Sequence, residues 1–146
     1  MYTDVLHFMK ACGHEPSDKL VALYHDLVTE EVGELEVGIA KFNAAESHDE
    51  LIAAKAETLD AICDSIWVLI GLARAMDLPL DWGWDEVAIT NFKKIDPELG
   101  IVRRDENGKI MKPERWVPPD MVRIIKNYEL RNKDPELPST QDLQDS

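Results

Sequence analysis

Four acidic residues fall into two pairs that share one spacing. Glu31 and Glu34 stand three positions apart, and Glu57 and Asp60 repeat that separation further along the chain. Side chains three residues apart lie on one face of an α-helix, so each pair presents its two carboxylates together. If the two helices fold back on each other, Glu34 is expected opposite Glu57, and Glu31 then falls opposite Asp60. Four converging carboxylates repel one another unless a cation joins them, so the pattern predicts a site for a hard divalent cation with oxygen ligands.

The elements that position these acids are two long helices, predicted at about 17–42 and 49–76. Apolar residues recur at spacings of three and four through both segments, which is typical of a helix face that packs on a core. Residues 43–47 break the pattern, and Ser47 followed by Glu50 indicates a capping box that opens the second helix. The acids lie within or beside the apolar stripe, where a carboxylate requires a partner, a proton or a metal ion. Either pair alone is typical of surface acids, whereas two pairs in matching register favour the cation site.

The rest of the chain is predicted to hold shorter helices and one hairpin. Helices are expected at about 3–11, 82–95 and 120–130. Asn107-Gly108 stands between short β-prone flanks within residues 101–111, which is a signal for a short β-hairpin. The prediction is one all-α domain over residues 1–132 with this basic β-hairpin. A polar tail at 133–146 is expected to be flexible or an extended arm.

Composition narrows the classes of function. The 146 residues include 29 acidic and 16 basic ones, for a formal net charge of -13. This charge argues against binding to a nucleic acid polymer or to an anionic membrane. Two cysteines, Cys12 and Cys63, are too few for a disulfide framework, and neither a leader peptide nor a membrane-spanning stretch is evident. We therefore expect a soluble, cytoplasmic protein.

The charge is distributed unevenly along the chain. Residues 93–126 hold nine basic and six acidic side chains, so this segment is basic within an acidic protein. An acidic part that binds a cation and a basic part that binds phosphate oxygens suit a metal-chelated polyphosphate. Without the four paired acids, the same segment would be interpreted as ordinary surface charge on a hairpin.

Several segments resemble a known enzyme family. Glu30-Glu31-Val-Gly-Glu34 followed by Glu57-Thr-Leu-Asp60 resembles the EExxE…ExxD motif of the MazG-like all-α nucleoside triphosphate pyrophosphohydrolases. The segments 90–94, 105–113 and 118–120 are similar to the phage and phosphoribosyl-ATP-pyrophosphohydrolase-like branch, which includes MazZ-type enzymes that act on (d)GTP. The resemblance extends over roughly residues 1–121.

The resemblance implies a set of site residues and a reaction. The implied metal ligands are Glu31, Glu34, Glu57 and Asp60, with Mg²⁺ as the cofactor and Mn²⁺ as a substitute. The implied substrate contacts are Asn91, Lys94, Lys109 and Lys112. Lys94 would also neutralise the departing charge, and Glu30 would act as a base or bind another metal ion, with a solvated Glu30 side chain as the alternative. The reaction is hydrolysis between the α- and β-phosphates to NMP and pyrophosphate, with a purine nucleotide such as dGTP preferred.

The resemblance also implies a four-helix MazG-like core and an assembly, either a homodimer or a homotetramer. If the chain comes from a phage, its location is the host cytoplasm. Two alternative functions remain open. One is an enzyme of the same kind with dUTP or phosphoribosyl-ATP as substrate. The other is a non-catalytic helical interaction module that uses its acids for a structural metal or for partner binding.

Overall fold

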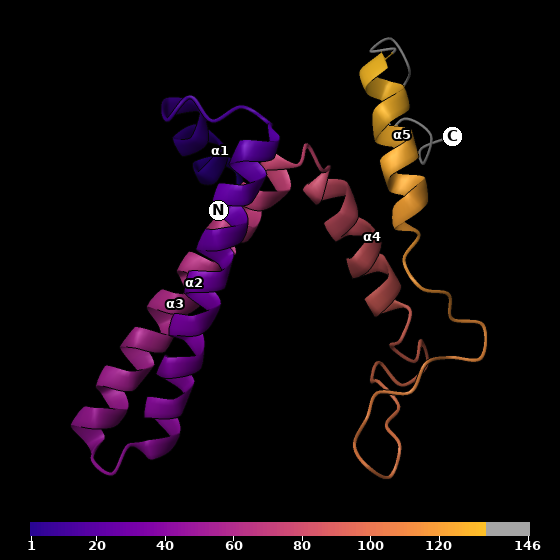
Figure 1. Ribbon diagram of the computed structural model, residues 1–146. Coiled ribbons are helices and arrows are strands. Elements are labelled where there is room, and N and C mark those ends of the chain that lie inside the picture. Colours follow the sequence, from indigo (N-terminus) through magenta and orange to yellow (C-terminus); the bar gives the residue numbers. More distant parts are fainter. Residues whose placement is uncertain (134–146) are drawn as a thin grey trace. The chain divides into compact units, whose positions relative to one another are not determined.

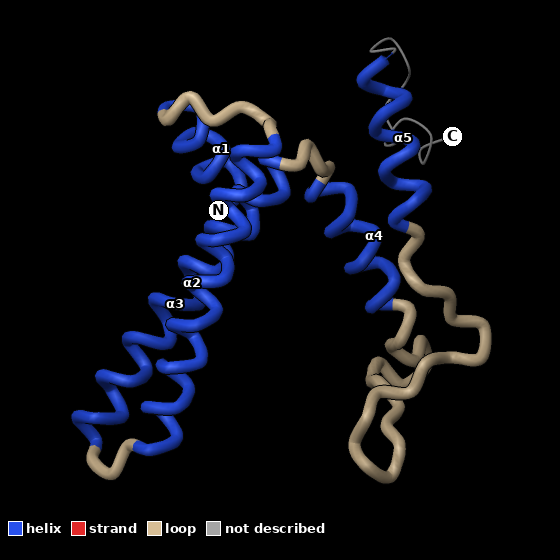
Figure 2. The backbone as a smooth tube through the Cα atoms, viewed as in Figure 1, coloured by secondary structure: helices blue, strands red, loops and turns tan. Residues whose placement is uncertain are grey.

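The computed structural model describes residues 1–133 and contains five helices there (Figure 1). They are α1 (Tyr2–Ala11), α2 (Asp18–Ala44), α3 (His48–Ala75), α4 (Leu80–Phe92) and α5 (Met121–Lys133). No strand occurs within residues 1–133, so the all-α class is confirmed (Figure 2). The chain divides into two compact units, unit 1 at Met1–Leu78 and unit 2 from Pro79 onward. Apart from Lys133, the tail predicted at 133–146 lies outside the described residues.

Side-chain caps determine where the two long helices begin. Ahead of α2, the Ser17 hydroxyl accepts a hydrogen bond from the Leu20 amide at 3.3 Å. Ahead of α3, the Ser47 hydroxyl accepts from the Glu50 amide at 3.2 Å, and the Glu50 carboxylate accepts from the Ser47 amide at 3.2 Å. These bonds satisfy amides that have no partner within the helix, so the predicted capping box is confirmed. Among residues 1–133, no helix is long and apolar enough to cross a membrane.

Two glycines allow α2 and α3 to approach each other closely in an antiparallel pair (Figure 1). A Cβ atom on Gly38 of α2 would stand 2.9 Å from the Thr58 hydroxyl oxygen of α3. A Cβ atom on Gly71 of α3 would overlap the ring of Tyr24, which is buried. Because neither position has room for a side chain, these two contacts set the register of the hairpin.

The observed register differs from the predicted one by four to five residues, roughly 6–7.5 Å along the axis. The prediction aligned the acids with one another, and it would have set Gly38 opposite Ala53 rather than Thr58. The expected pairing of Glu34 with Glu57 at one level is therefore wrong. Close packing at the glycines decides the register, because exposed carboxylates contribute little to how two helices pack.

The first helix completes the core of unit 1 by packing against α3. Val5 and Met9 of α1 are each 1% exposed, which makes them the most deeply buried large side chains described. The rings of Phe8 and Trp67 meet edge-on, with their centroids 5.7 Å apart. Burial of Val5 and Met9 stabilises the end of the hairpin that carries Tyr24.

In unit 2, Glu86 joins α4 to the start of α5. Its carboxylate accepts hydrogen bonds from the Asp120 amide at 3.1 Å and from the Arg123 guanidinium at 2.6 Å. The Asp120 amide, and after it the Arg123 side chain, hold the pKa of Glu86 below its ordinary value. The rings of Trp82 and Tyr128 add an edge-on contact between the two helices, with centroids 5.8 Å apart.

The segment between α4 and α5 turns back on itself at the predicted place. Gly108 has a φ of 79°, in the left-handed region that favours glycine. Arg104 and Ile110 form an isolated antiparallel bridge across this turn. Ile95 and Val102, which both precede the turn, form another isolated bridge. An isolated bridge pairs only one residue with one other and does not form two strands. The turn is therefore confirmed, whereas the predicted β-hairpin is not.

Candidate metal and phosphate sites

An acidic depression lies on one side of the α2–α3 hairpin. The hollow measures about 460 Å³, and its walls are formed by Glu30, Gly33, Glu34, Val37, Lys41, Glu57 and Asp60. The lining residues from α2 recur at spacings of three and four, which places them on one face of that helix. From α3 the hollow is lined by Glu57 and Asp60, which are three positions apart. Both acidic motifs therefore meet at one surface, even though the register differs from the predicted one.

Glu31 is the one predicted metal ligand that does not line this hollow. It is half-buried, and burial raises the pKa of Glu31. Neighbouring negative charges raise it further, in the order Asp64, Glu34, Glu30 and Asp60. The shifted register explains why Asp64 acts on Glu31 more strongly than Asp60 does. Glu30, Glu31, Glu34, Glu57 and Asp60 together form what we call the acidic cluster.

Lys41 is a member of this site that the sequence pattern did not single out. Its ammonium group makes an ion pair with the Glu57 carboxylate across the hairpin, at 2.5 Å. The two side chains are 53% and 50% exposed, so the pair contributes at most about 1 kcal/mol. The signal was present in the sequence, because Lys41 stands two helical turns after Glu34 and so shares its face. Lys41 is thus a weak internal competitor for a cation at Glu57.

The donor set of the acidic cluster suits a hard divalent cation, because carboxylate oxygens are ligands that Mg²⁺ prefers. As the side chains are placed, however, no three or more His, Cys, Asp or Glu residues within 1–133 are arranged so that they could hold a metal ion. The Glu57 carboxylate is instead paired with Lys41 across the hairpin. The carboxylate ligands are therefore of the type that suits the cation. Their side chains would have to rotate before three or more of them could coordinate it together.

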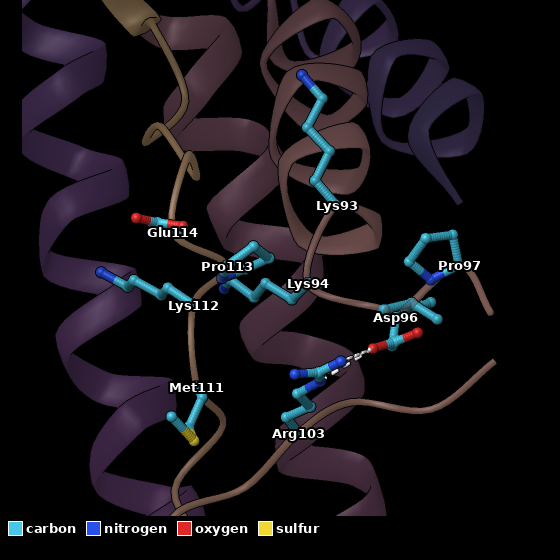
Figure 3. Close-up of a pocket in the computed structure, with 10 residues that line it drawn as sticks. Lys93, Lys94, Asp96, Pro97, Arg103, Met111, Lys112, Pro113 and Glu114 are labelled. Carbon is cyan, nitrogen blue, oxygen red and sulfur yellow. Dashed lines mark hydrogen bonds and ion pairs between the residues drawn. The ribbon is translucent and has the colours of Figure 1, made fainter. Parts of the chain in front are cut away.

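The predicted phosphate contacts separate into two groups in unit 2. Lys94 and Lys112 line a hollow of about 480 Å³, whereas Asn91 and Lys109 are not among its lining residues (Figure 3). Asn91 is nevertheless close, because its side-chain oxygen accepts a hydrogen bond from Lys94 Nζ at 2.6 Å. Lys109 belongs to the turn, where its amide donates to the Asp105 carboxylate at 2.9 Å.

Arg103 also lines this hollow, which we call the basic hollow, although the sequence pattern did not single out Arg103. Its Nε and Nη2 donate to one carboxylate oxygen of Asp96 at 2.9 and 2.5 Å (Figure 3). The amides of Leu99 and Glu98 donate to the other oxygen of Asp96. The Arg103 side chain first, and then these amides, hold the pKa of Asp96 below its ordinary value of 3.8. Because Asp96 neutralises Arg103, the lysines determine the charge of the hollow.

Comparison of the chain with known protein families and with curated proteins finds no match in either set. The resemblance to the MazG-like enzymes therefore rests on the motif residues alone.

Proposed function

We propose that this protein is a Mg²⁺-dependent nucleoside triphosphate pyrophosphohydrolase. The main support is that both acidic motifs meet at one hollow, with Glu30, Glu34, Glu57 and Asp60 in its walls. Such a cluster repels free phosphate but suits a phosphate that arrives chelated to a divalent cation. The hollow lined by Lys94 and Lys112 adds side chains suited to phosphate oxygens.

In the proposed reaction, water adds across the bond between the α- and β-phosphates. One phosphorus–oxygen bond forms to the water oxygen, the bridging phosphorus–oxygen bond breaks, and NMP and pyrophosphate leave with release of a proton. Glu31, Glu34, Glu57 and Asp60 would hold Mg²⁺, which when bound supplies positive charge against the phosphate oxygens. Glu30 lies in the wall of the same hollow, where its carboxylate can accept the proton of the attacking water.

Lys94 is proposed to neutralise the charge that develops on the leaving pyrophosphate. The hydrogen bond to Asn91 holds its ammonium group, so less reorientation is needed when the anion arrives. Asn91, Lys109 and Lys112 are proposed as further substrate contacts. The preference for a purine deoxynucleotide such as dGTP comes from the family resemblance, and dUTP and phosphoribosyl-ATP are the alternative substrates.

The proposal includes a homodimer or homotetramer with a four-helix core, and a short basic β-hairpin at 101–111. Many large apolar side chains on the two long helices are exposed, namely Leu23, Val32, Val37, Ile39 and Phe42 on α2 and Ile52, Leu59, Ile62, Ile66 and Leu69 on α3. Exposed apolar surface of this extent is typical of an interface, and a second copy of the chain would bury it. Light scattering at micromolar concentration should give two or four times the chain mass of 16.6 kDa. A monomer mass would contradict the proposed assembly.

The enzymatic proposal is tested by product analysis on a panel of ribo- and deoxyribonucleoside triphosphates that includes dUTP, with phosphoribosyl-ATP as a further substrate. We expect NMP and pyrophosphate in equal amounts, formed only when Mg²⁺ or Mn²⁺ is present. The ranking of kcat/KM over the panel identifies the base and the sugar. If no compound on the panel is hydrolysed with either cation, the enzymatic proposal fails and the non-catalytic helical module is favoured.

A further inference from the structure

Trp116 is tied to the C-terminal end of α4. Its indole N–H donates a hydrogen bond to the Thr90 carbonyl oxygen at 3.0 Å, and Thr90 is buried. Thr90 is among the last four residues of α4, whose carbonyl groups have no partner inside the helix. The hydrogen bond therefore satisfies an otherwise unpaired acceptor and holds the indole ring at the end of the helix.

Two ammonium groups lie over this one ring. Lys94 Nζ is 5.2 Å and Lys112 Nζ is 4.2 Å from the ring centroid, and both distances are within the range of cation–π attraction. Lys94 follows α4, whereas Lys112 comes after the turn at Gly108. Two like charges repel, and attraction of both ammonium groups to the ring offsets that repulsion. Trp116 therefore holds together two cations from separate segments.

The hollow that Lys94 and Lys112 line has an excess of positive charge (Figure 3). Its other ionisable lining residues are Lys93, Asp96, Arg103 and Glu114. Asp96 and Arg103 neutralise each other through two hydrogen bonds, so three lysines remain against one glutamate. Adjacent cations of this kind suit an anion with several neighbouring charges, and linked phosphate groups have that character.

We propose that Trp116 is a positioning residue that holds Lys94 and Lys112 together as a binding site for a polyphosphate chain. The inference rests on the proposed function for its natural ligand, the triphosphate of a nucleotide. Binding itself does not depend on hydrolysis, because the site is built within residues 90–116 and its charge comes from lysines. The role of Trp116 is to place the two ammonium groups with its aromatic face.

The test is the binding of inorganic tripolyphosphate to the full chain, measured by isothermal titration calorimetry with EDTA at fixed ionic strength. Chelation of divalent cations isolates the basic hollow, because the acidic cluster alone repels the anion. Trp116→Phe keeps an aromatic face but loses the N–H group, whereas Trp116→Leu loses both. We expect Trp116→Leu to raise the Kd at least roughly tenfold and Trp116→Phe to raise it by no more than about threefold. Lys126→Met, which removes an exposed lysine of α5 outside the hollow, is the matched control and should leave the Kd unchanged.

Two results with the Trp116 variants would overturn the proposal. Wild-type affinity in Trp116→Leu would show that the ring is not needed. Equal weakening in Trp116→Leu and Trp116→Phe would assign the effect to the hydrogen bond with Thr90 rather than to the ring. If circular dichroism shows that Trp116→Leu does not fold, Lys112→Met decides, because it leaves Trp116 and its hydrogen bond in place. Lys112→Met should raise the Kd at least roughly tenfold, and an unchanged Kd would reject the site.

Hydrolysis assays distinguish failure of this inference from failure of the proposed function. If tripolyphosphate binding depends on the ring but no nucleotide is hydrolysed with Mg²⁺, the anion site stands and the enzymatic proposal fails. If nucleotides are hydrolysed with the same kcat and KM in Trp116→Leu as in the wild type, the enzymatic proposal stands and the positioning role of Trp116 fails.

Discussion

The α2–α3 hairpin and the segment 93–116 place their charged groups by different means. In the hairpin, two long regular helices carry the acids, and close packing at Gly38 and Gly71 sets their relative levels. In the segment 93–116, side-chain hydrogen bonds at Asp96 and the aromatic ring of Trp116 hold the cations. The placement of the acids is thus a property of helix register, whereas the placement of the cations depends on a few individual contacts.

This difference implies that the two regions respond differently to substitution. The backbone hydrogen bonds of a helix are internal, so the loss of one exposed carboxylate leaves its neighbours in position. A turn that is held by a few side chains loses several positions at once when one of them is removed. We therefore expect substitutions of exposed acids in the hairpin to lower activity without disturbing folding. Substitutions in the segment 93–116 should weaken binding and also change the local structure.

The largest effect is expected for the acidic cluster. Glu34→Gln and Asp60→Asn each remove one charge from the acidic hollow without altering side-chain size, and should lower Mg²⁺-dependent pyrophosphate release by at least roughly a hundredfold. Helical content measured by circular dichroism should be nearly unchanged, because Glu34 and Asp60 are exposed. Glu36→Gln is the matched control, since Glu36 lies on the same helix outside the hollow. Full activity in either cluster variant would contradict the metal assignment.

The glycines of the hairpin test whether register depends on close packing. Gly71→Ala would place a Cβ atom inside the ring of Tyr24 and should lower the free energy of unfolding by roughly 1–3 kcal/mol. Gly33→Ala on α2 meets open space and should instead raise it by up to about 1 kcal/mol, because alanine is the better helix former. Urea denaturation of both variants measures the contrast. Equal stability changes of the same sign would show that the close contact at Tyr24 does not constrain the helices.

A substitution of Lys41, the basic residue that lines the acidic hollow, tests the ion pair of the hairpin. Lys41→Met removes the competitor of the cation at Glu57 and should tighten Mn²⁺ binding by about fivefold at most, since an exposed ion pair contributes up to about 1 kcal/mol. Titration calorimetry measures the affinity. Lys55→Met on α3 makes the same change in net charge outside the hollow, and should have the smaller effect. If both variants tighten binding equally, net charge and not the ion pair is responsible.

The smallest effect is expected for the pH dependence of the segment 93–116. The folded state holds the pKa of Asp96 below 3.8, so its stabilising contribution is present above that ordinary value and is lost as pH falls through the lower folded-state pKa. Thermal unfolding of the wild type should therefore show a larger acid-side loss of Tm than that of Asp96→Asn, in which Glu86 still contributes its own loss. Asp85→Asn, at an exposed position on α4, should keep the wild-type pH profile. Identical profiles for the wild type and Asp96→Asn would contradict the role of the Asp96–Arg103 pair.

Local sequence determined most of the secondary structure of this protein. Both long helices start at serine caps that the sequence displays, and the predicted helices match the observed ones to within a few residues. The turn at Gly108 was predictable for the same reason, because a left-handed backbone favours glycine there. The spacing within each acidic pair likewise determined that its two members share one face of their own helix. These features depend on residues within a few positions of each other, and local preferences decide them.

Tertiary packing alone decided how the segments meet. The register of α2 on α3 follows from the fit of Gly38 to Thr58 and of Gly71 to Tyr24, residues that are far apart in the chain. The pairing of Lys41 with Glu57 is a consequence of that register. Trp116 joins Lys94 to Lys112 by contacts that no periodic pattern records. Charge spacing could not predict these contacts, because steric fit and burial set how the segments pack, and exposed charges then adjust to the packing.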